Sequence, residues 1–270
     1  MKTIRLIHNL PRSGGTIISK CLGAQKDIVL LSEIHPEGVS VSKKMGVNVP
    51  VFDPVYQIQK WNNLFEESEY KEILNSNLKF EEKIELVYEK TELANKRLII
   101  RDWAFVDFFG RPFIEPSYKN SLFEILSKKY KVLNFYLIRH PLKLFSSCYN
   151  NLGFFRRDYD FEFFLKGYRN YFLNASKGNI CVFEHFIEKP EKKLKNMCDV
   201  FEIDYDNNYF EKLKDVNLTG DKIAIESLEI HNKDSLSTKK LLKKDDLNKI
   251  KNRPDYLKLM EDLENHYQNV

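Results

Sequence analysis

A chain of 270 residues with 43% apolar side chains is long enough to build a hydrophobic core, and its 20 Phe and 14 Tyr residues argue against a disordered chain. The 43 basic and 39 acidic residues are intermixed and leave a net charge of only +4, whereas a nucleic-acid-binding protein usually concentrates its basic residues in one stripe. We therefore expect no nucleic-acid partner, and we interpret the lysine runs at residues 192–195 and 239–244 as solvated helix faces.

Short apolar segments rich in Ile, Val, Leu and aromatic residues predict buried parallel strands, and segments with helical spacing lie between them. The predicted strands are residues 3–10, 27–32, 97–101, 132–138 and 179–183. The predicted helices are residues 14–22, 80–96, 141–151, 189–201 and 245–267. This alternation predicts an α/β fold with a central parallel sheet of about five strands flanked by helices.

The remaining segments are less regular in sequence. Residues 34–60 and 103–120 hold five of the nine prolines, and we predict that they are irregular loops at the sheet edge, where substrates usually enter. The region 215–250 is polar and ambiguous. Because no repeat and no low-complexity linker divides the chain, we expect a single domain over residues 1–270.

The cysteines and the N-terminal segment indicate the cellular compartment of the protein. The four cysteines are far apart and show neither a CxxC pair nor metal-ligand spacing, which predicts reduced core thiols and no metal site. The N-terminal segment, residues 1–15, ends too soon to form a signal peptide. No apolar run approaches the roughly 18 residues of a membrane helix. These features predict a soluble, cytoplasmic protein with no membrane span.

A glycine-containing loop follows the first predicted strand directly and leads into a helix. It reads Pro11-Arg12-Ser13-Gly14-Gly15-Thr16. Glycines let backbone N–H groups approach an anion, and the helix N-terminus adds free N–H donors and positive potential. Ser13 and Thr16 offer hydroxyl donors, and Arg12 supplies a mobile charge. The pattern favours a phosphate-binding loop, although a plain strand-to-helix turn also has this composition.

The same loop is not a Walker A motif. That motif needs a Lys followed by Ser or Thr, whose hydroxyl holds Mg²⁺. Here no Lys precedes Thr16, and the basic residue Arg12 comes before the glycines. A P-loop kinase that acts on a small molecule is therefore only an alternative interpretation.

A second candidate anion site follows the fourth predicted strand. Arg139 stands at the carboxyl end of that strand, and Ser147 follows about two helical turns later. Ligands of open α/β sheets bind beyond the carboxyl ends of the strands, so Arg12 and Arg139 should face one crevice. Two such sites suit a ligand with phosphates at two places. A surface salt bridge for Arg139 and an ordinary helical position for Ser147 are the alternatives.

Together these motifs resemble those of the sulfotransferases that use 3'-phosphoadenosine 5'-phosphosulfate (PAPS) and release 3'-phosphoadenosine 5'-phosphate (PAP). The family pairs a loop of the form P-[KR]-[ST]-G-[TGS]-[TS] with a distal R-x-P-x(5)-S, which stands here as Arg139-His140-Pro141 and Ser147. Weaker similarities follow at residues 183–203 and 216–221. The resemblance implies a P-loop-like sulfotransferase fold. It also implies that the 5'-phosphosulfate is bound by Arg12, Ser13, Gly14, Gly15, Thr16 and Ile17, and the 3'-phosphate by Arg139 and Ser147.

The chain departs from the family at the general base. Many members carry a catalytic His after the third strand in a K-T-H context, but this chain has Arg101-Asp102-Trp103 there. Other members use a Glu after the second strand, and Glu33 occupies that place, with His35 nearby. We predict Glu33 as the base, with His35 and Asp102 as alternates and Arg12 as the group that stabilises the leaving phosphate. A cap for Glu33, a loop position for His35 and an ion pair with Arg101 or Arg111 for Asp102 are the structural alternatives.

The acceptor is not named by the sequence. Trp103, Phe105, Phe108 and Phe109 follow the third strand and either line an acceptor pocket or pack in the core. The resemblance implies a small-molecule, carbohydrate or lipid acceptor and no metal. A non-catalytic protein that binds PAP or PAPS is a further alternative, because the family's histidine is absent.

Overall fold

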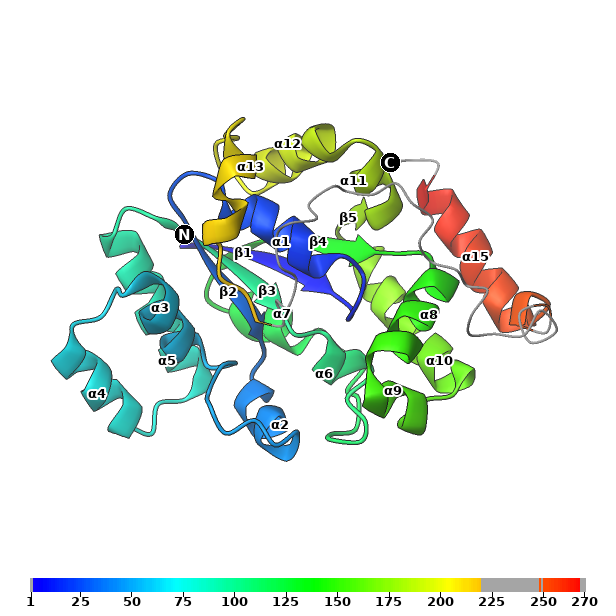
Figure 1. Cartoon of the computed structure of the whole chain (residues 1–270), viewed down its shortest axis with the longest axis horizontal. Coiled ribbons are helices and arrows are strands. Elements are labelled where there is room, and N and C mark those ends of the chain that lie inside the picture. Colours follow the sequence, from blue (N-terminus) through cyan, green and yellow to red (C-terminus); the bar gives the residue numbers. More distant parts are fainter. Residues whose placement is uncertain (1, 220–247, 249, 268–270) are drawn as a thin grey trace.

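Five parallel strands form one sheet in the computed structural model, which describes residues 2–219, 248 and 250–267 (Figure 1). The strand order is β2-β3-β1-β4-β5. This confirms the predicted α/β class and the parallel sheet of about five strands. The strands are β1 (Thr3–Asn9), β2 (Ile28–Ile34), β3 (Arg97–Asp102), β4 (Lys131–Ile138) and β5 (Asn179–Val182).

The strands are rich in apolar residues because helices cover both faces of the sheet. Successive side chains of a strand point to opposite faces. In β4, Phe135 and Leu137 pack into the core on one face, and Tyr136 and Ile138 pack into the core on the other. Each face of the sheet therefore has its own hydrophobic core.

The first face is covered by α1 (Gly15–Gly23), α12 (Pro190–Val200) and the 3-10 turn η1 (Leu213–Asp215). On the opposite face, one group of helices covers the half with β2 and β3, and another covers the half with β4. In Figure 1 the first group extends from the left side to the centre, and the second group lies at the right. The first group is α3 (Pro54–Asn62), α5 (Phe80–Leu93) and α7 (Ser121–Leu126), and the second is α8 (Pro141–Asn151) and α10 (Phe161–Ala175).

The prediction of irregular structure at residues 34–60 and 103–120 was wrong in part. These segments contain α2 (Gly38–Lys44), α3 and the short α6 (Phe105–Phe108). The prolines were misinterpreted, because proline is favoured in the first turn of a helix. Asp53 caps α3 through Oδ1, which accepts hydrogen bonds from the backbone of Val55 and Tyr56 at 2.9 and 3.1 Å, and Pro54 follows as the first helical residue.

The predicted helix 245–267 is interrupted just before Pro254. Residues 248, 250 and 251 are helical, residues 252 and 253 are not, and α15 runs over Pro254–Tyr267. Proline disfavours a helical conformation in the preceding residue, which explains the interruption. Residues 245–247, the lysine run at 239–244 and most of the region 215–250 lie outside the described residues. The other helices are α4 (Glu67–Asn75), α9 (Gly153–Asp158), α11 (Phe183–Glu188) and α13 (Tyr209–Lys212).

None of the helices within the described part of the chain is both long enough and apolar enough to span a bilayer.

Candidate functional site

The two predicted anion anchors lie at one edge of the sheet. Loop 11–16 leaves the carboxyl end of β1, and Arg139 follows the carboxyl end of β4 directly. β1 and β4 are neighbours and pair in parallel from Thr3 with Lys131 to Asn9 with Leu137. Parallel neighbours end at the same edge, which is where ligands of such sheets bind.

Loop 11–16 turns sharply before it enters α1. Arg12 and Gly14 both have left-handed backbone conformations, with φ of 67° and 93°. The backbone N–H and the hydroxyl of Ser13 donate to the carbonyl of Leu10 at 3.2 and 2.7 Å. The Ser13 hydroxyl proton is thus bound within the loop, and Ser13 holds the turn closed.

The N-terminus of α1 has the free donors that an anion needs. The helix begins at Gly15, and within the described residues no side chain caps its first turn. The first N–H groups of a helix lack partners inside the helix, so those of Gly15, Thr16 and Ile17 are available to a bound anion.

Close neighbours leave no room for a side chain at either glycine of the loop. A Cβ atom on Gly14 would overlap the ring of Phe183, and a Cβ atom on Gly15 would overlap the side chain of Asn9. Gly14 also needs its positive φ, which side chains other than glycine rarely adopt. The loop is therefore packed on both sides by residues of β1 and α11.

The two anchors contact each other directly. Arg12 Nε donates to Ser147 Oγ at 3.2 Å, and Arg139 Nη1 donates to the carbonyl of Arg12 at 2.7 Å. Arg12 lies in the loop after β1, Arg139 directly follows β4, and Ser147 lies in α8. The structure thus brings together three residues that the sequence analysis selected from two distant motifs.

Arg139 is held in a partly desolvated position. Burial lowers the pKa of its guanidinium, Glu184 raises it in part, and the neighbouring Arg12 lowers it further. An arginine stays charged at neutral pH, so Arg12 and Arg139 place two like charges close together.

Glu33 occupies a distorted position near the end of β2. Its φ is 58°, and the pairing of β2 with β3 shifts between Ser32 and Ile34. A left-handed non-glycine residue is strained, and such strain is found most often at functional sites. The carboxylate Oε1 lies 3.2 Å from Nη2 of Arg101, and its side chain stays 27% exposed.

Arg101 connects Glu33 to loop 11–16. Its side chain is 2% exposed, and Nη1 donates to Thr16 Oγ1 at 3.2 Å. Because Thr16 accepts this hydrogen bond, its own hydroxyl proton is left to donate to a ligand. From the sequence alone, Arg101 was interpreted only as a partner for Asp102. An arginine directly after the apolar segment 98–100 was the signal that could have identified it.

A later segment of the chain is fixed to the same strand ends by Thr219. Nη2 of Arg101 donates to the Thr219 carbonyl at 3.2 Å, and the Thr219 and Ser32 hydroxyls lie 2.7 Å apart. Thr219 belongs to the segment 216–221 that resembles the sulfotransferases, of which residues 220 and 221 lie outside the described residues. It therefore adjoins the Arg101 connection.

His35, one alternate for the base, is buried away from solvent. Its side chain is 2% exposed, Nε2 lies 3.2 Å from Asp107 Oδ2, and Nδ1 accepts from the backbone N–H of Glu37 at 3.0 Å. Asp107 also accepts from Ser117 and Ser121. Burial tends to raise the pKa of Asp107, but the hydrogen bonds from His35 and the two serines lower it overall. His35 thus connects the segment after β2 to α6.

Asp102, the other alternate, belongs to a second buried pair. Its Oδ2 lies 2.8 Å from Nδ1 of His8, and the two side chains are 1% and 0% exposed. The His8 ring stacks on Tyr136, with centroids 4.5 Å apart. The partner of Asp102 is therefore His8, whereas Arg101 and Arg111 were the partners considered from the sequence.

The aromatic cluster after β3 lies in the core. Trp103, Phe105, Phe108 and Phe109 are 8%, 3%, 1% and 0% exposed. The Trp103 ring stacks on Phe52, with centroids 4.2 Å apart. This burial favours the core interpretation of the cluster over an acceptor pocket.

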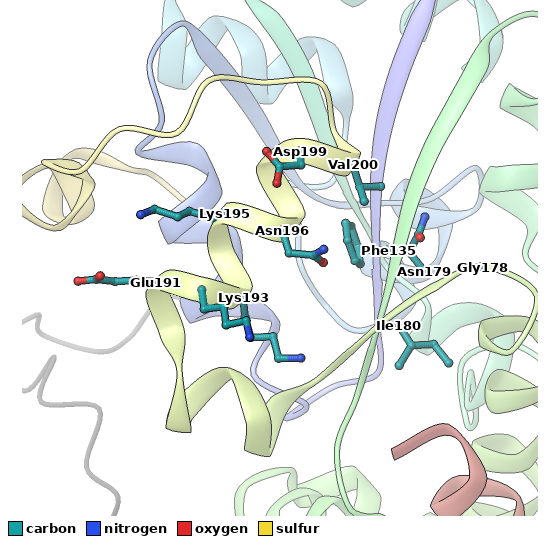
Figure 2. Close-up of a pocket in the computed structure, with 11 residues that line it drawn as sticks. Phe135, Gly178, Asn179, Ile180, Glu191, Lys193, Lys195, Asn196, Asp199 and Val200 are labelled. Carbon is teal, nitrogen blue, oxygen red and sulfur yellow. The ribbon is translucent and has the colours of Figure 1, made fainter. Parts of the chain in front are cut away.

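A cavity of about 880 Å³ opens at a different place, between α12 and the beginning of β5. Figure 2 shows Asn196 and Asp199 of α12 beside Phe135 and Asn179. None of its lining residues is one of the predicted site residues. Within the described residues, no group of three His, Cys, Asp or Glu side chains could hold a metal ion, and the absence of a metal stays a prediction.

The strand order β2-β3-β1-β4-β5, with helices on both faces, defines an α/β fold with a parallel sheet. The chain has the sulfotransferase fold. It superposes on the sulfotransferase domain from the Synechococcus PCC 7002 olefin synthase with a TM-score of 0.59, at 16% identity over 77% of this chain and 76% of that chain. For the sulfotransferase domain from the curacin biosynthetic pathway, the TM-score is 0.55 at 17% identity over 78% and 77%.

No model of a protein family matches the chain, and no curated protein matches it either. The similarity to the two domains concerns the fold alone.

Proposed function

We propose that the protein transfers the sulfuryl group of PAPS to a hydroxyl or amine of an acceptor and releases PAP. The observation that carries this proposal is the contact between the anchors, in which Arg12 donates to Ser147 and Arg139 donates to the Arg12 carbonyl. Two adjacent cations at neighbouring strand ends suit a ligand with phosphates at two places. PAPS is such a ligand, and the sulfotransferase fold supports the choice.

The proposed donor site divides the ligand between the two anchors. The N–H groups at the start of α1 and the Thr16 hydroxyl hold the 5'-phosphosulfate, and Arg139 and Ser147 hold the 3'-phosphate. The acceptor oxygen or nitrogen forms a bond to sulfur while the bond from sulfur to the bridging phosphate oxygen breaks. Arg12 stabilises the negative charge that develops on that oxygen.

Glu33 is the proposed general base. Its side chain is 27% exposed and lies at the strand ends. It contacts Arg101, which also donates to Thr16. By contrast, the side chains of His35 and Asp102 are buried in pairs with Asp107 and His8. A base must reach the proton of a bound acceptor, so the accessible carboxylate is the better candidate.

The proposed acceptor is a small molecule, a carbohydrate or a lipid. We also propose that the protein acts in the cytoplasm, because its four cysteines are unpaired and buried, as in proteins of reducing compartments. A non-catalytic protein that binds PAP is the second candidate function, since Trp103 stands where many sulfotransferases carry their histidine.

Sulfur-35 transfer from labelled PAPS to a panel of phenols, sugars, amines and hydroxylated lipids tests the proposal. The expected result is a labelled product together with stoichiometric PAP. Tight binding of PAP without transfer to any acceptor would favour the non-catalytic candidate. Turnover of ATP with Mg²⁺ and none of PAPS would favour the small-molecule kinase.

A further inference from the structure

Phe183 lies between the two anchors of the proposed donor site. It is the first residue of α11 and directly follows β5, which ends beside β4 at the same sheet edge. The side chain is only partly buried. Its position was not singled out for function by either motif.

One face of the Phe183 ring is fixed by loop 11–16. The ring occupies the space that a side chain at Gly14 would need. Since Gly14 opens the first turn before α1, the loop and the ring can only shift together. The ring therefore has a defined place relative to the 5'-phosphate end of the site.

The ring also contacts the Arg139 guanidinium. The central carbon Cζ of Arg139 lies 5.1 Å from the ring centroid, within the range of a cation–π contact. Nη1 of Arg139 donates to the Arg12 carbonyl, while Nε has no partner among the described residues. The aromatic ring and one carbonyl thus orient a guanidinium that has donors left for a ligand.

We infer that Phe183 is a positioning residue that orients Arg139 and thereby selects nucleotides that carry a 3'-phosphate. This inference rests on the proposed function, in which Arg139 binds the 3'-phosphate. Phe183 has no donor or charge of its own, so it acts through Arg139. A planar guanidinium binds phosphate through a fixed pair of N–H groups, and its orientation therefore determines how well it binds.

Calorimetric titration with PAP and with adenosine 5'-phosphate (AMP) tests the inference, because the two nucleotides differ only in the 3'-phosphate. Phe183→Leu keeps an apolar side chain but removes the aromatic face. We expect it to weaken PAP binding about fivefold and to leave AMP binding unchanged. Phe183→Tyr keeps the aromatic face and should preserve the wild-type ratio of the two affinities. Phe183→Met replaces the Leu variant if that variant does not fold.

Arg139→Ala serves as the reference for loss of the 3'-phosphate contact. An equal loss of PAP and AMP affinity in Phe183→Leu would overturn the inference, since the ring would then contact the nucleoside or merely support the loop. An unchanged ratio in Phe183→Leu would overturn it as well. If wild-type protein binds PAP no more tightly than AMP, the proposed function fails at its 3'-phosphate site, and the inference fails with it.

Discussion

Arg12 Nε donates a hydrogen bond to Ser147 Oγ at 3.2 Å, although 135 positions separate the two residues in the chain. One residue belongs to the loop after β1, and the other lies in α8, two turns beyond Arg139. The contact joins the two sequence motifs into one site before any ligand is bound. It also means that Ser147 orients the side chain that we expect at the leaving phosphate.

Replacement of Ser147 by alanine should weaken PAP binding. The variant loses a hydrogen bond to a charged group, so we expect a loss of about fivefold to tenfold, equivalent to roughly 1 kcal/mol. Ser146→Ala is a matched control, because Ser146 is also buried in α8 but its hydroxyl has no partner among the described residues. Calorimetry on both variants should give a clear difference, and equal affinities would remove Ser147 from the site.

Gly14→Ala should destabilise the protein more than Gly46→Ala. Both glycines have positive φ, at 93° and 80°, but only Gly14 has a neighbour in the way, the ring of Phe183. We expect about 1 kcal/mol for the backbone strain at Gly46 and about 2–4 kcal/mol at Gly14, where overpacking adds to the strain. Urea denaturation measures both. Similar values for the two variants would mean that the loop relaxes away from Phe183.

Glu33→Gln should slow sulfuryl transfer about 100-fold or more, because the amide cannot take the acceptor proton. PAP affinity should stay within about twofold of wild type, since the carboxylate has no proposed role in donor binding. Glu37→Gln is the control, as Glu37 is an exposed carboxylate close by in the sequence. The transfer assay and a PAP titration are both needed. Full activity in Glu33→Gln would assign the base to another residue.

Asp107 should contribute to loss of stability in acid. Its folded pKa is lowered, because hydrogen bonds from His35, Ser117 and Ser121 outweigh the effect of burial. A lowered pKa gives stability that is present above the ordinary carboxyl pKa of about 4 and is lost as pH falls through the folded value. Asp107→Asn should therefore lose less stability than wild type between about pH 5 and pH 3.

Thermal melting at a series of pH values measures this effect. Asp199→Asn, at an exposed position of α12, should follow wild type at every pH. Parallel curves for wild type and Asp107→Asn would show that Asp107 is not a source of the acid sensitivity.

The cysteines should be inert in the native protein. Burial raises the pKa of Cys21, Cys148, Cys181 and Cys198 to about 12. At pH 8 only about one thiol in 10,000 is then a thiolate, the reactive form. Ellman's reagent should find no fast-reacting thiol in native protein and all four after denaturation in urea. Fast reaction of a native thiol would reveal local opening around it.

The sequence predicted the sheet well, because each strand contains a short, mostly apolar segment that packs in the core. It also singled out Arg12, Arg139 and Ser147, which the structure brings into contact, and their role at a bound anion stays a prediction. It failed where proline begins a helix, as at Pro54. The connections of Arg101 to Thr16 and Glu33 join three separate chain segments, so no local pattern reports them. Burial of His35 and Asp102 likewise depends on partners far along the chain.

The most direct test of the donor site is calorimetry with PAP in EDTA and with ATP in Mg²⁺, on wild type and on Arg139→Ala. We predict that PAP binds wild type without a metal and more tightly than ATP with Mg²⁺. We also predict that Arg139→Ala loses at least about tenfold in PAP affinity, as expected for a charged hydrogen bond. Tighter binding of ATP with Mg²⁺, or unchanged PAP affinity in Arg139→Ala, would contradict the two-anchor site and the sulfotransferase assignment that depends on it.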